Sequence, residues 1–379
     1  MLTFITFLLG TAQFVIVGIL DNIATSVDVS VSTAGQLITV FSLANAIGTP
    51  IVMVATAKMN QRNRLLLALG IMLLGIIMTV TLPGFGFLML SRIVLGVGNG
   101  FFVATAYSLA PKLAPAGREV RAMSNVALGF SASLVFGVPI GRVIASSFDW
   151  KVIFLGIGFF TLLGIFFIAR TIPDMEGEAP VPLVKQLTLL KNPKVAVALC
   201  VTFFMFIGYS TVNTYITPFL TTVVRMSGGK ISVILFILGI GSIIGSKLGG
   251  VVADRIGITR MLVGGMGIQA ISLVLLSIFS GSVIVSIVLL MLWMVTAWTF
   301  LPPQNFNLVS LVPDASGIIL SLNNSFVQFG FAAGAGFGGV IMGSLSVAAI
   351  TWFGAASVAF AAILAAVSYG RAYKVSNAR

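Results

Sequence analysis

The 379-residue sequence contains no histidine and a single cysteine, Cys200. Metal sites and catalytic triads built on histidine are therefore excluded, and one cysteine forms neither an internal disulfide nor a cysteine-rich metal cluster. The phosphate-binding pattern GxxxxGK(S/T) is also absent, so any use of ATP would require another chain. We expect no metal, no cofactor and no enzymatic activity.

Charged residues are scarce as well. They make up 8% of the chain against 58% hydrophobic residues, and the mean hydropathy is +1.14. Soluble domains carry about 25% charged residues, which keep their surfaces in water. A chain this apolar is expected to lie in a lipid bilayer and to cross it several times.

Apolar segments long enough to cross the hydrocarbon core, about 20 residues each, occur twelve times. The expected helical spans are 2–26, 34–57, 65–82, 86–110, 122–147, 151–171, 195–222, 231–253, 261–280, 283–308, 316–343 and 346–370. The longest polar stretch between them is rich in proline and carries an acidic run, as linkers do. The sequence therefore predicts an all-α protein with six-helix bundles over 1–172 and 195–379, joined by a cytoplasmic linker over 173–194.

The basic residues are placed unevenly around these spans. If the N-terminus is cytoplasmic, fifteen of the 21 lysines and arginines fall in inside segments and four in outside segments. The four outside residues are Arg142, Lys151, Arg225 and Lys230. Basic residues favour cytoplasmic loops, so both termini are predicted to be cytoplasmic. The net charge of +12 is explained by topology, and we expect no nucleic-acid partner.

Two segments of the chain repeat at one spacing. Gly48 in AIGTPIVMVATAK matches Gly245 in IIGSKLGGVVADR, and GVPIGRVI (137–144) matches GAGFGGVI (334–341), both 197 residues apart. A shared offset indicates that the two halves are duplicates. Duplicated halves of this kind typically place a substrate site at their interface near the bilayer midplane.

Four motifs carry a family resemblance. Residues 11–24 read TAQFVIVGILDNIA, Arg92 is followed by Gly96 and Gly100, GVPIG occupies 137–141 and GVVADRIG occupies 250–257. These resemble the first-span, fourth-span RxxxG, fifth-span GxPxG and loop GxxxDRxG motifs of the major facilitator superfamily, in its twelve-span drug:H+ antiporter branch. The segments APAGREVRA (114–122), TYITPF (214–219) and VPDAS (312–316) are most similar to sugar-efflux and purine-efflux members.

The resemblance implies a secondary active transporter, a monomer in the cytoplasmic (inner) membrane of a bacterial-type cell. It implies export of small-molecule substrates (sugars, purines or amphipathic drugs) in exchange for protons by alternating access. Gln13 stands where the branch has a first-span glutamate, the usual candidate for carrying the coupling proton. Glutamine does not titrate, so an uncoupled facilitator of the same solutes is the alternative.

Two charged residues are predicted to lie inside the membrane together. Asp21 lies in the last two turns of span one, which runs outward, and Arg92 lies on span four, which runs inward, so both fall in the outer half. An ionisable group there is costly unless it is paired or hydrated. We expect Asp21 and Arg92 to form a pair that couples protons to transport. A static pair, or an Asp21 that reaches the interface, is the alternative.

Amide and aromatic side chains supply candidate substrate contacts. Amides gather in spans one, two, four, five, seven, ten and eleven, as expected for helices that face a cavity rather than lipid. Each amide alone serves equally well to join two helices. The candidate substrate-binding residues are Gln13, Asn45, Asn99, Asn125, Tyr209, Asn213, Trp298, Gln304, Asn305, Asn324 and Gln328.

A last group of residues is expected to shape the helices or their movement. Gly137, Pro139 and Gly141 let span five bend and approach its neighbour closely. The pair Pro302-Pro303 is expected to break or kink span ten. The family resemblance also implies that Asp254 and Arg255 latch one conformation.

Overall fold

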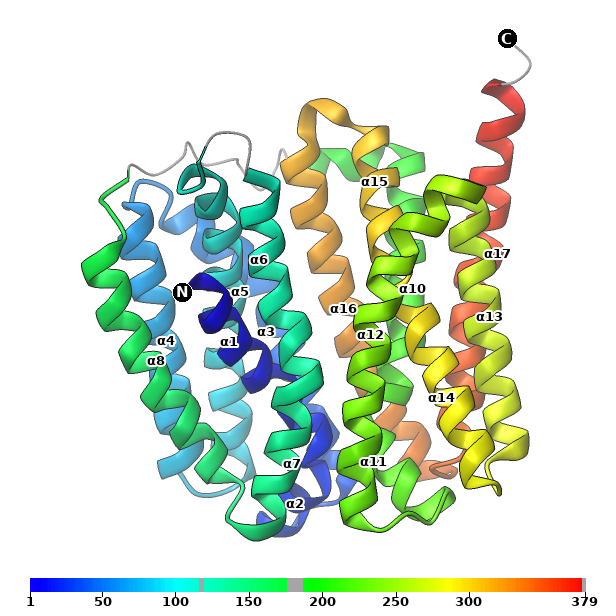
Figure 1. Cartoon of the computed structure of the whole chain (residues 1–379), viewed down its shortest axis with the longest axis horizontal. Coiled ribbons are helices and arrows are strands. Elements are labelled where there is room, and N and C mark those ends of the chain that lie inside the picture. Colours follow the sequence, from blue (N-terminus) through cyan, green and yellow to red (C-terminus); the bar gives the residue numbers. More distant parts are fainter. Residues whose placement is uncertain (116–118, 176–186, 377–379) are drawn as a thin grey trace. The chain divides into compact units, whose positions relative to one another are not determined.

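The computed structural model describes residues 1–115, 119–175 and 187–376. The chain divides into two units, Met1–Leu183 and Val184–Arg379, and each unit is built of helices (Figure 1). Of the expected linker 173–194, residues 176–186 lie outside the described residues, as do 116–118 of the segment APAGREVRA. The linker boundaries stay a prediction.

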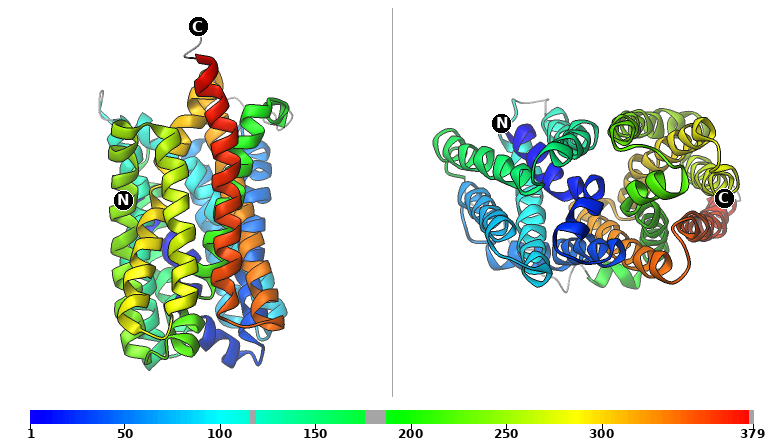
Figure 2. Two further views of the ribbon diagram at one scale, coloured as in Figure 1. Left: turned by 90° about the vertical axis from the view of Figure 1, so that its right-hand side faces the viewer. Right: turned by 90° about the horizontal axis from the view of Figure 1, so that it is seen from below.

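The described residues of the first unit form six spans when the bent helix pair at its start counts as one. Its elements are α1 (Leu2–Gly18), α2 (Leu20–Ser26), α3 (Val31–Ala55), α4 (Gln61–Thr81), α5 (Phe85–Lys112), α6 (Glu119–Ala132), the π-helix η1 (Ser133–Gly137), α7 (Val138–Ser147) and α8 (Lys151–Thr171). Figure 2 (right) shows these helices end-on, standing side by side. Large apolar side chains on α8, such as Leu155, Phe159 and Phe166, are more than half exposed. Such a surface is suited to lipid contact rather than to water.

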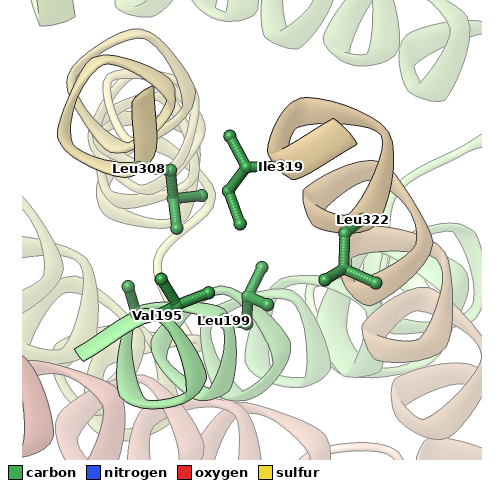
Figure 3. Packing of buried hydrophobic residues seen from close by; sticks show 6 residues of the cluster. Val195, Leu199, Leu308, Ile319 and Leu322 are labelled. Carbon is green, nitrogen blue, oxygen red and sulfur yellow. The ribbon is translucent and has the colours of Figure 1, made fainter. Parts of the chain in front are cut away.

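The second unit repeats this pattern. Its elements are η2 (Leu189–Lys191), α10 (Pro193–Thr214), α11 (Ile216–Pro218), η3 (Phe219–Val223), α12 (Gly228–Ile256), α13 (Ile258–Phe279), α14 (Val283–Trp298), α15 (Leu301–Leu311), η4 (Pro313–Ala315), α16 (Ser316–Ser344) and α17 (Ala349–Ser376). A buried apolar cluster joins α10, α15 and α16 (Figure 3). It comprises Val195, Ala198, Leu199, Leu308, Ile319 and Leu322.

The predicted all-α, twelve-span fold is confirmed. Within the described residues, eleven helices are long and apolar enough to cross a membrane, and α1 with α2 makes a twelfth when the bent pair counts as one span. Spans one and ten are each interrupted. The axes of α1 and α2 differ by 72° at Ile19, a bend that the sequence analysis did not predict. Span ten is interrupted between Trp298 and Leu301, just before Pro302 and Pro303, as predicted. The cytoplasmic placement of both termini stays a prediction.

Glycines bring the first and fifth spans of each unit together. A Cβ added at Gly137 would lie 2.3 Å from Thr11 Oγ1, and one added at Gly141 would lie 2.1 Å from Val15 Cγ2. The matching Gly334 on α16 packs on the backbone of α10, where a Cβ would lie 2.4 Å from the carbonyl oxygen of Ile207. Small residues allow this close approach of helices in a membrane.

Span five also contains an irregular turn. The π-helix η1 ends at Gly137, and Pro139 follows in the first turn of α7. Proline has no N–H to donate to the residue four positions earlier, and π-helical turns accommodate such interruptions. The turn lies beside the middle of α1, where Ser133 faces Gly10 and Gly137 faces Thr11. Span five therefore has the irregular backbone expected of Gly137 and Pro139, while its part in movement stays a prediction.

Candidate transport-site residues

The break in span one is held by an arginine from span five. Arg142 of α7 is buried, and its Nη1 donates to the carbonyl oxygen of Gly18 at 3.0 Å and to Asn22 Oδ1 at 3.0 Å. The same nitrogen forms an ion pair with Asp21 Oδ1. A carbonyl released by a helix break needs a new donor inside a membrane. Arg142 meets that need for Gly18 and at the same time neutralises Asp21.

Further contacts fasten α2 to the helices around it. Asn22 Nδ2 donates to the carbonyl oxygen of Ala145 at 3.3 Å, and Trp150 Nε1 donates to Ser26 Oγ at 2.8 Å. The Asp21 side chain is 37% exposed, whereas the Arg142 side chain is 10% exposed. The carboxylate is therefore within reach of water, and its partner is largely shielded from it.

The predicted pair of Asp21 with Arg92 is wrong in this structure, because the partner of Asp21 is Arg142. The placement of basic residues around the spans predicts Arg142 in an outside segment. The bend at Ile19 carries α2 towards α7, where Arg142 lies. Arg142 falls within the apolar run 122–147, five residues before its end, and this position is the signal in the sequence that identifies it as a membrane arginine.

Arg92 lies elsewhere in the first unit. It is 1% exposed, and its guanidinium carbon lies 4.7 Å from the centre of the Phe154 ring on α8. Its Nη1 is 3.4 Å from the carbonyl oxygen of Ala12 on α1, a long hydrogen bond. Its Nε and Nη2 are buried and have no hydrogen-bond partner among the described residues. Arg92 is thus a buried cation without an ion pair in the described part of the chain.

Two residues of the first unit that are predicted to bind substrate, Asn45 and Asn99, contact each other. Asn99 Nδ2 donates to the carbonyl oxygen of Leu9 at 3.1 Å and Asn45 Nδ2 lies 3.5 Å from Asn99 Oδ1. Both asparagines are buried, and the contacts join α1, α3 and α5. Gln13 is half-buried on α1, and Asn125 is exposed on α6.

A second amide network lies in the other unit. Gln304 Nε2 donates to the carbonyl oxygen of Ala198 at 2.7 Å and to Thr202 Oγ1 at 3.0 Å, and Thr202 Oγ1 donates to Asn323 Oδ1 at 2.8 Å. Asn323 Nδ2 then donates to Asn305 Oδ1 at 2.9 Å. These bonds join α10, α15 and α16, and they give Gln304 and Asn305 structural partners.

The remaining predicted contacts of the second unit differ in accessibility. Asn213 and Gln328 are buried, and the Oε1 of Gln328 has no hydrogen-bond partner among the described residues. Asn324, next to the buried Asn323, is exposed. Accessibility therefore separates neighbours that the sequence presents as equivalent.

The predicted aromatic contacts form one cluster. Tyr209 stacks on Trp293, with ring centres 5.3 Å apart and planes 17° apart. Trp298 Nε1 donates to the Tyr209 hydroxyl at 3.3 Å, and Trp298 is half-buried whereas Tyr209 is buried. Phe206 and Phe331 complete the cluster around Tyr209. Trp298 is thus its accessible member among the predicted residues.

The predicted latch residues lie at the end of α12. Asp254 and Arg255 are both exposed, and neither takes part in an ion pair among the described residues. In the first unit, by contrast, Arg62 pairs with Asp174 at 3.1 Å and also donates to the carbonyl oxygen of Ala169. No three potential metal ligands cluster within the described ranges.

Comparison with known proteins identifies the family. The family model described as Major Facilitator Superfamily matches residues 2–335 and 198–378 of the chain. The chain belongs to the Major Facilitator Superfamily. The predicted superfamily is therefore confirmed, and the chain is a multi-pass membrane transporter of this superfamily.

Similar proteins cover nearly the whole chain. It is 43% identical over 362 residues to "Uncharacterized MFS-type transporter YbcL" of Bacillus subtilis (strain 168), covering 96% of this chain and 93% of that protein. It is 26% identical to "Inner membrane transport protein YdhP" of Escherichia coli (strain K12), covering 88% and 86%.

Solved structures share the fold at low identity. A crystal structure of a D-xylose-proton symporter aligns with a TM-score of 0.77 at 16% identity, covering 96% of this chain and 95% of that one. A crystal structure of the human organic anion transporter MFSD10 aligns with a TM-score of 0.70 at 16% identity, covering 96% and 98%. These likenesses show the fold alone.

Proposed function

We propose that the chain is a secondary active exporter of the cytoplasmic membrane that moves a small solute outward in exchange for protons by alternating access. The observation that carries the proposal is the Asp21–Arg142 ion pair at the break in span one. The proposed solutes are sugars, purines or amphipathic drugs, because the sequence most resembles exporters of such compounds.

The ion pair links a proton to a helix position. In the paired state the Asp21 carboxylate balances the buried charge of Arg142. Protonation of Asp21 removes that balance and leaves Arg142 with the neutral oxygens of Gly18 and Asn22. A switch of this kind biases a two-state element because it stabilises one arrangement more than the other. We infer that α2 and α7 are the element whose position follows the proton.

Arg92, predicted as part of the proton-coupling pair, takes no part in this link, since its contacts are with Ala12 and Phe154. The alternative function is an uncoupled facilitator. Gln13 favours it, because a neutral amide stands where the related exporters have a titratable group.

Everted vesicles with an acidic interior test the proposal. Sugars, purine bases and chloramphenicol-type drugs are added in turn while a pH-sensitive dye follows the gradient, with empty vesicles as control. For a transported solute, we expect wild-type protein to dissipate the gradient, and Asp21→Asn to abolish that effect while exchange of labelled solute at equal concentrations continues. Transport that leaves the gradient unchanged would establish the facilitator instead.

Asp28→Asn is the matched control for Asp21→Asn. Asp28 is an exposed carboxylate close to Asp21 in the chain, and it forms no ion pair among the described residues. Its φ is +53°, a conformation that asparagine also tolerates. Asp28→Asn should therefore keep proton exchange at the wild-type rate. An equal loss in both variants would mean that negative charge at this end of the chain matters, rather than the Asp21–Arg142 pair.

A further inference from the structure

Arg92 is a buried cation whose hydrogen-bonding capacity is largely unused. Arg92 is 1% exposed, and its Nη1 donates to the carbonyl oxygen of Ala12. Nε and Nη2 are buried and have no partner among the described residues. Guanidinium groups inside proteins normally satisfy these donors, because each buried donor without a partner is destabilising.

The two unused nitrogens belong to the same edge of the guanidinium group. The N–H of Nε and one N–H of Nη2 point in parallel, and this edge matches the two oxygens of a carboxylate. The guanidinium carbon lies over the Phe154 ring, 4.7 Å from its centre, and the ring interacts with the cation but accepts no conventional hydrogen bond. The arrangement leaves the carboxylate-binding edge without a partner in the described residues.

The described part of the chain supplies no anion for that edge. No carboxylate lies within 4.0 Å of Arg92 among the described residues, and Asp21 is paired with Arg142. Gln13, the residue after Ala12, is neutral and would not repel an incoming anion. An uncompensated buried charge is strongly destabilising. The balancing charge is therefore expected to arrive with a ligand.

We propose that Arg92 binds the carboxylate of the transported solute edge-on, through Nε and Nη2, with its guanidinium held over Phe154. The proposal rests on the proposed transport function, and it names organic acids as the solute class in place of the sugars, purines and amphipathic drugs that the sequence resemblance suggests. Because Arg92 is buried in this structure, binding accompanies a movement of the helices around it, as alternating access requires.

Formate and acetate, the smallest carboxylates, serve as probes. The full chain is purified in detergent, and its melting temperature is measured against rising sodium formate or acetate, with sodium chloride at equal ionic strength and neutral acetamide as references. A ligand that binds the folded state raises the melting temperature in a saturable manner. We expect such a rise for the carboxylates, beyond that for chloride, and none for acetamide.

Variants locate the effect. Arg92→Gln should lose the carboxylate-specific rise, and Arg92→Lys should show an apparent affinity about tenfold weaker, because a lysine lacks the two parallel donors. Arg170→Gln is the matched control, since the Arg170 guanidinium also lies over a phenylalanine ring, 5.3 Å from the centre of Phe166, but is exposed. It should retain the full effect.

Several outcomes would overturn the proposal. They are the absence of a carboxylate-specific rise in wild type, an equal rise with chloride, and persistence of the rise in Arg92→Gln. If Arg92→Gln does not fold, Arg92→Lys carries the test, and an unchanged affinity in that variant contradicts edge-on binding. The measurement uses no proton gradient, so a failure of proton exchange in vesicles leaves its result intact, and the two failures are distinguishable.

Discussion

The guanidinium of Arg142 pairs with the carboxylate of Asp21 and, through the same nitrogen, with the carbonyl oxygen of Gly18. Gly18 ends α1 and Asp21 lies in α2, so one side chain of span five contacts both sides of the break in span one. The bent first span is therefore defined by its contact with the fifth span as well as by its own backbone.

Removing Arg142 should destabilise the first unit more than removing the charge of Asp21. Arg142→Gln leaves Asp21 and the Gly18 carbonyl without their shared donor, and we expect a loss of about 1–3 kcal/mol. Asp21→Asn keeps an acceptor beside Arg142 and should cost less. Thermal unfolding in detergent measures both, with Arg170→Gln as the control for loss of an arginine.

The double variant Asp21→Asn/Arg142→Gln tests whether the two residues act as a unit. Its loss should be smaller than the sum of the single losses, because residues in one ion pair couple. Additive losses would show that the ion pair contributes little to the stability of the fold, and the Gly18 contact would then account for the effect of Arg142.

Glycine-to-alanine substitutions should distinguish a collision with a neighbouring side chain from a collision with the neighbouring backbone. Gly141→Ala places a methyl group against a side-chain methyl of Val15, whereas Gly334→Ala places one against the backbone oxygen of Ile207. Overpacking of this kind typically costs about 1–3 kcal/mol. Val15→Ala should restore stability to Gly141→Ala, because it removes the colliding atom.

No side-chain truncation removes the collision at Gly334, so Gly334→Ala should stay destabilised in the background of Ile207→Ala. The control is Gly156→Ala on α8, where an added Cβ meets nothing within 4 Å. That variant should be as stable as wild type or slightly more stable, because alanine favours a helix more than glycine. Thermal unfolding of the five variants gives the comparison. Equal effects at Gly156 and Gly334 would contradict the role assigned to close packing.

The spans were predictable because the bilayer imposes their length and composition, and the glycine contacts because repeated small residues mark close helix pairs. The partner of Asp21 was not predictable. No proline marks the bend at Ile19, and the direction of α2 after that bend determines which arginine it meets. Nor does the sequence distinguish a buried amide that joins helices from an accessible one, since both are compatible with an apolar span.

The predicted latch of Asp254 and Arg255 should affect movement without affecting the stability of the second unit. Both residues are exposed, and they form no ion pair among the described residues, so Asp254→Asn should shift the melting temperature little. Surface charges without a partner usually contribute within about 0.5 kcal/mol. If the latch exists, the variant should still change the rate of solute exchange in vesicles. An unchanged rate would remove Asp254 from the conformational residues.

Asn323 and Asn324 offer a test of which amides bind solute. Asn323 accepts a hydrogen bond from Thr202 and donates one to Asn305, so Asn323→Ala breaks a buried network and should cost about 1–3 kcal/mol. Asn324 is exposed, and Asn324→Ala should leave the melting temperature close to that of wild type. If Asn324 contacts solute as the sequence predicts, the same variant should raise the solute concentration needed for half-maximal transport. A variant with normal stability and normal transport would show that exposure on α16 is not sufficient for a solute contact.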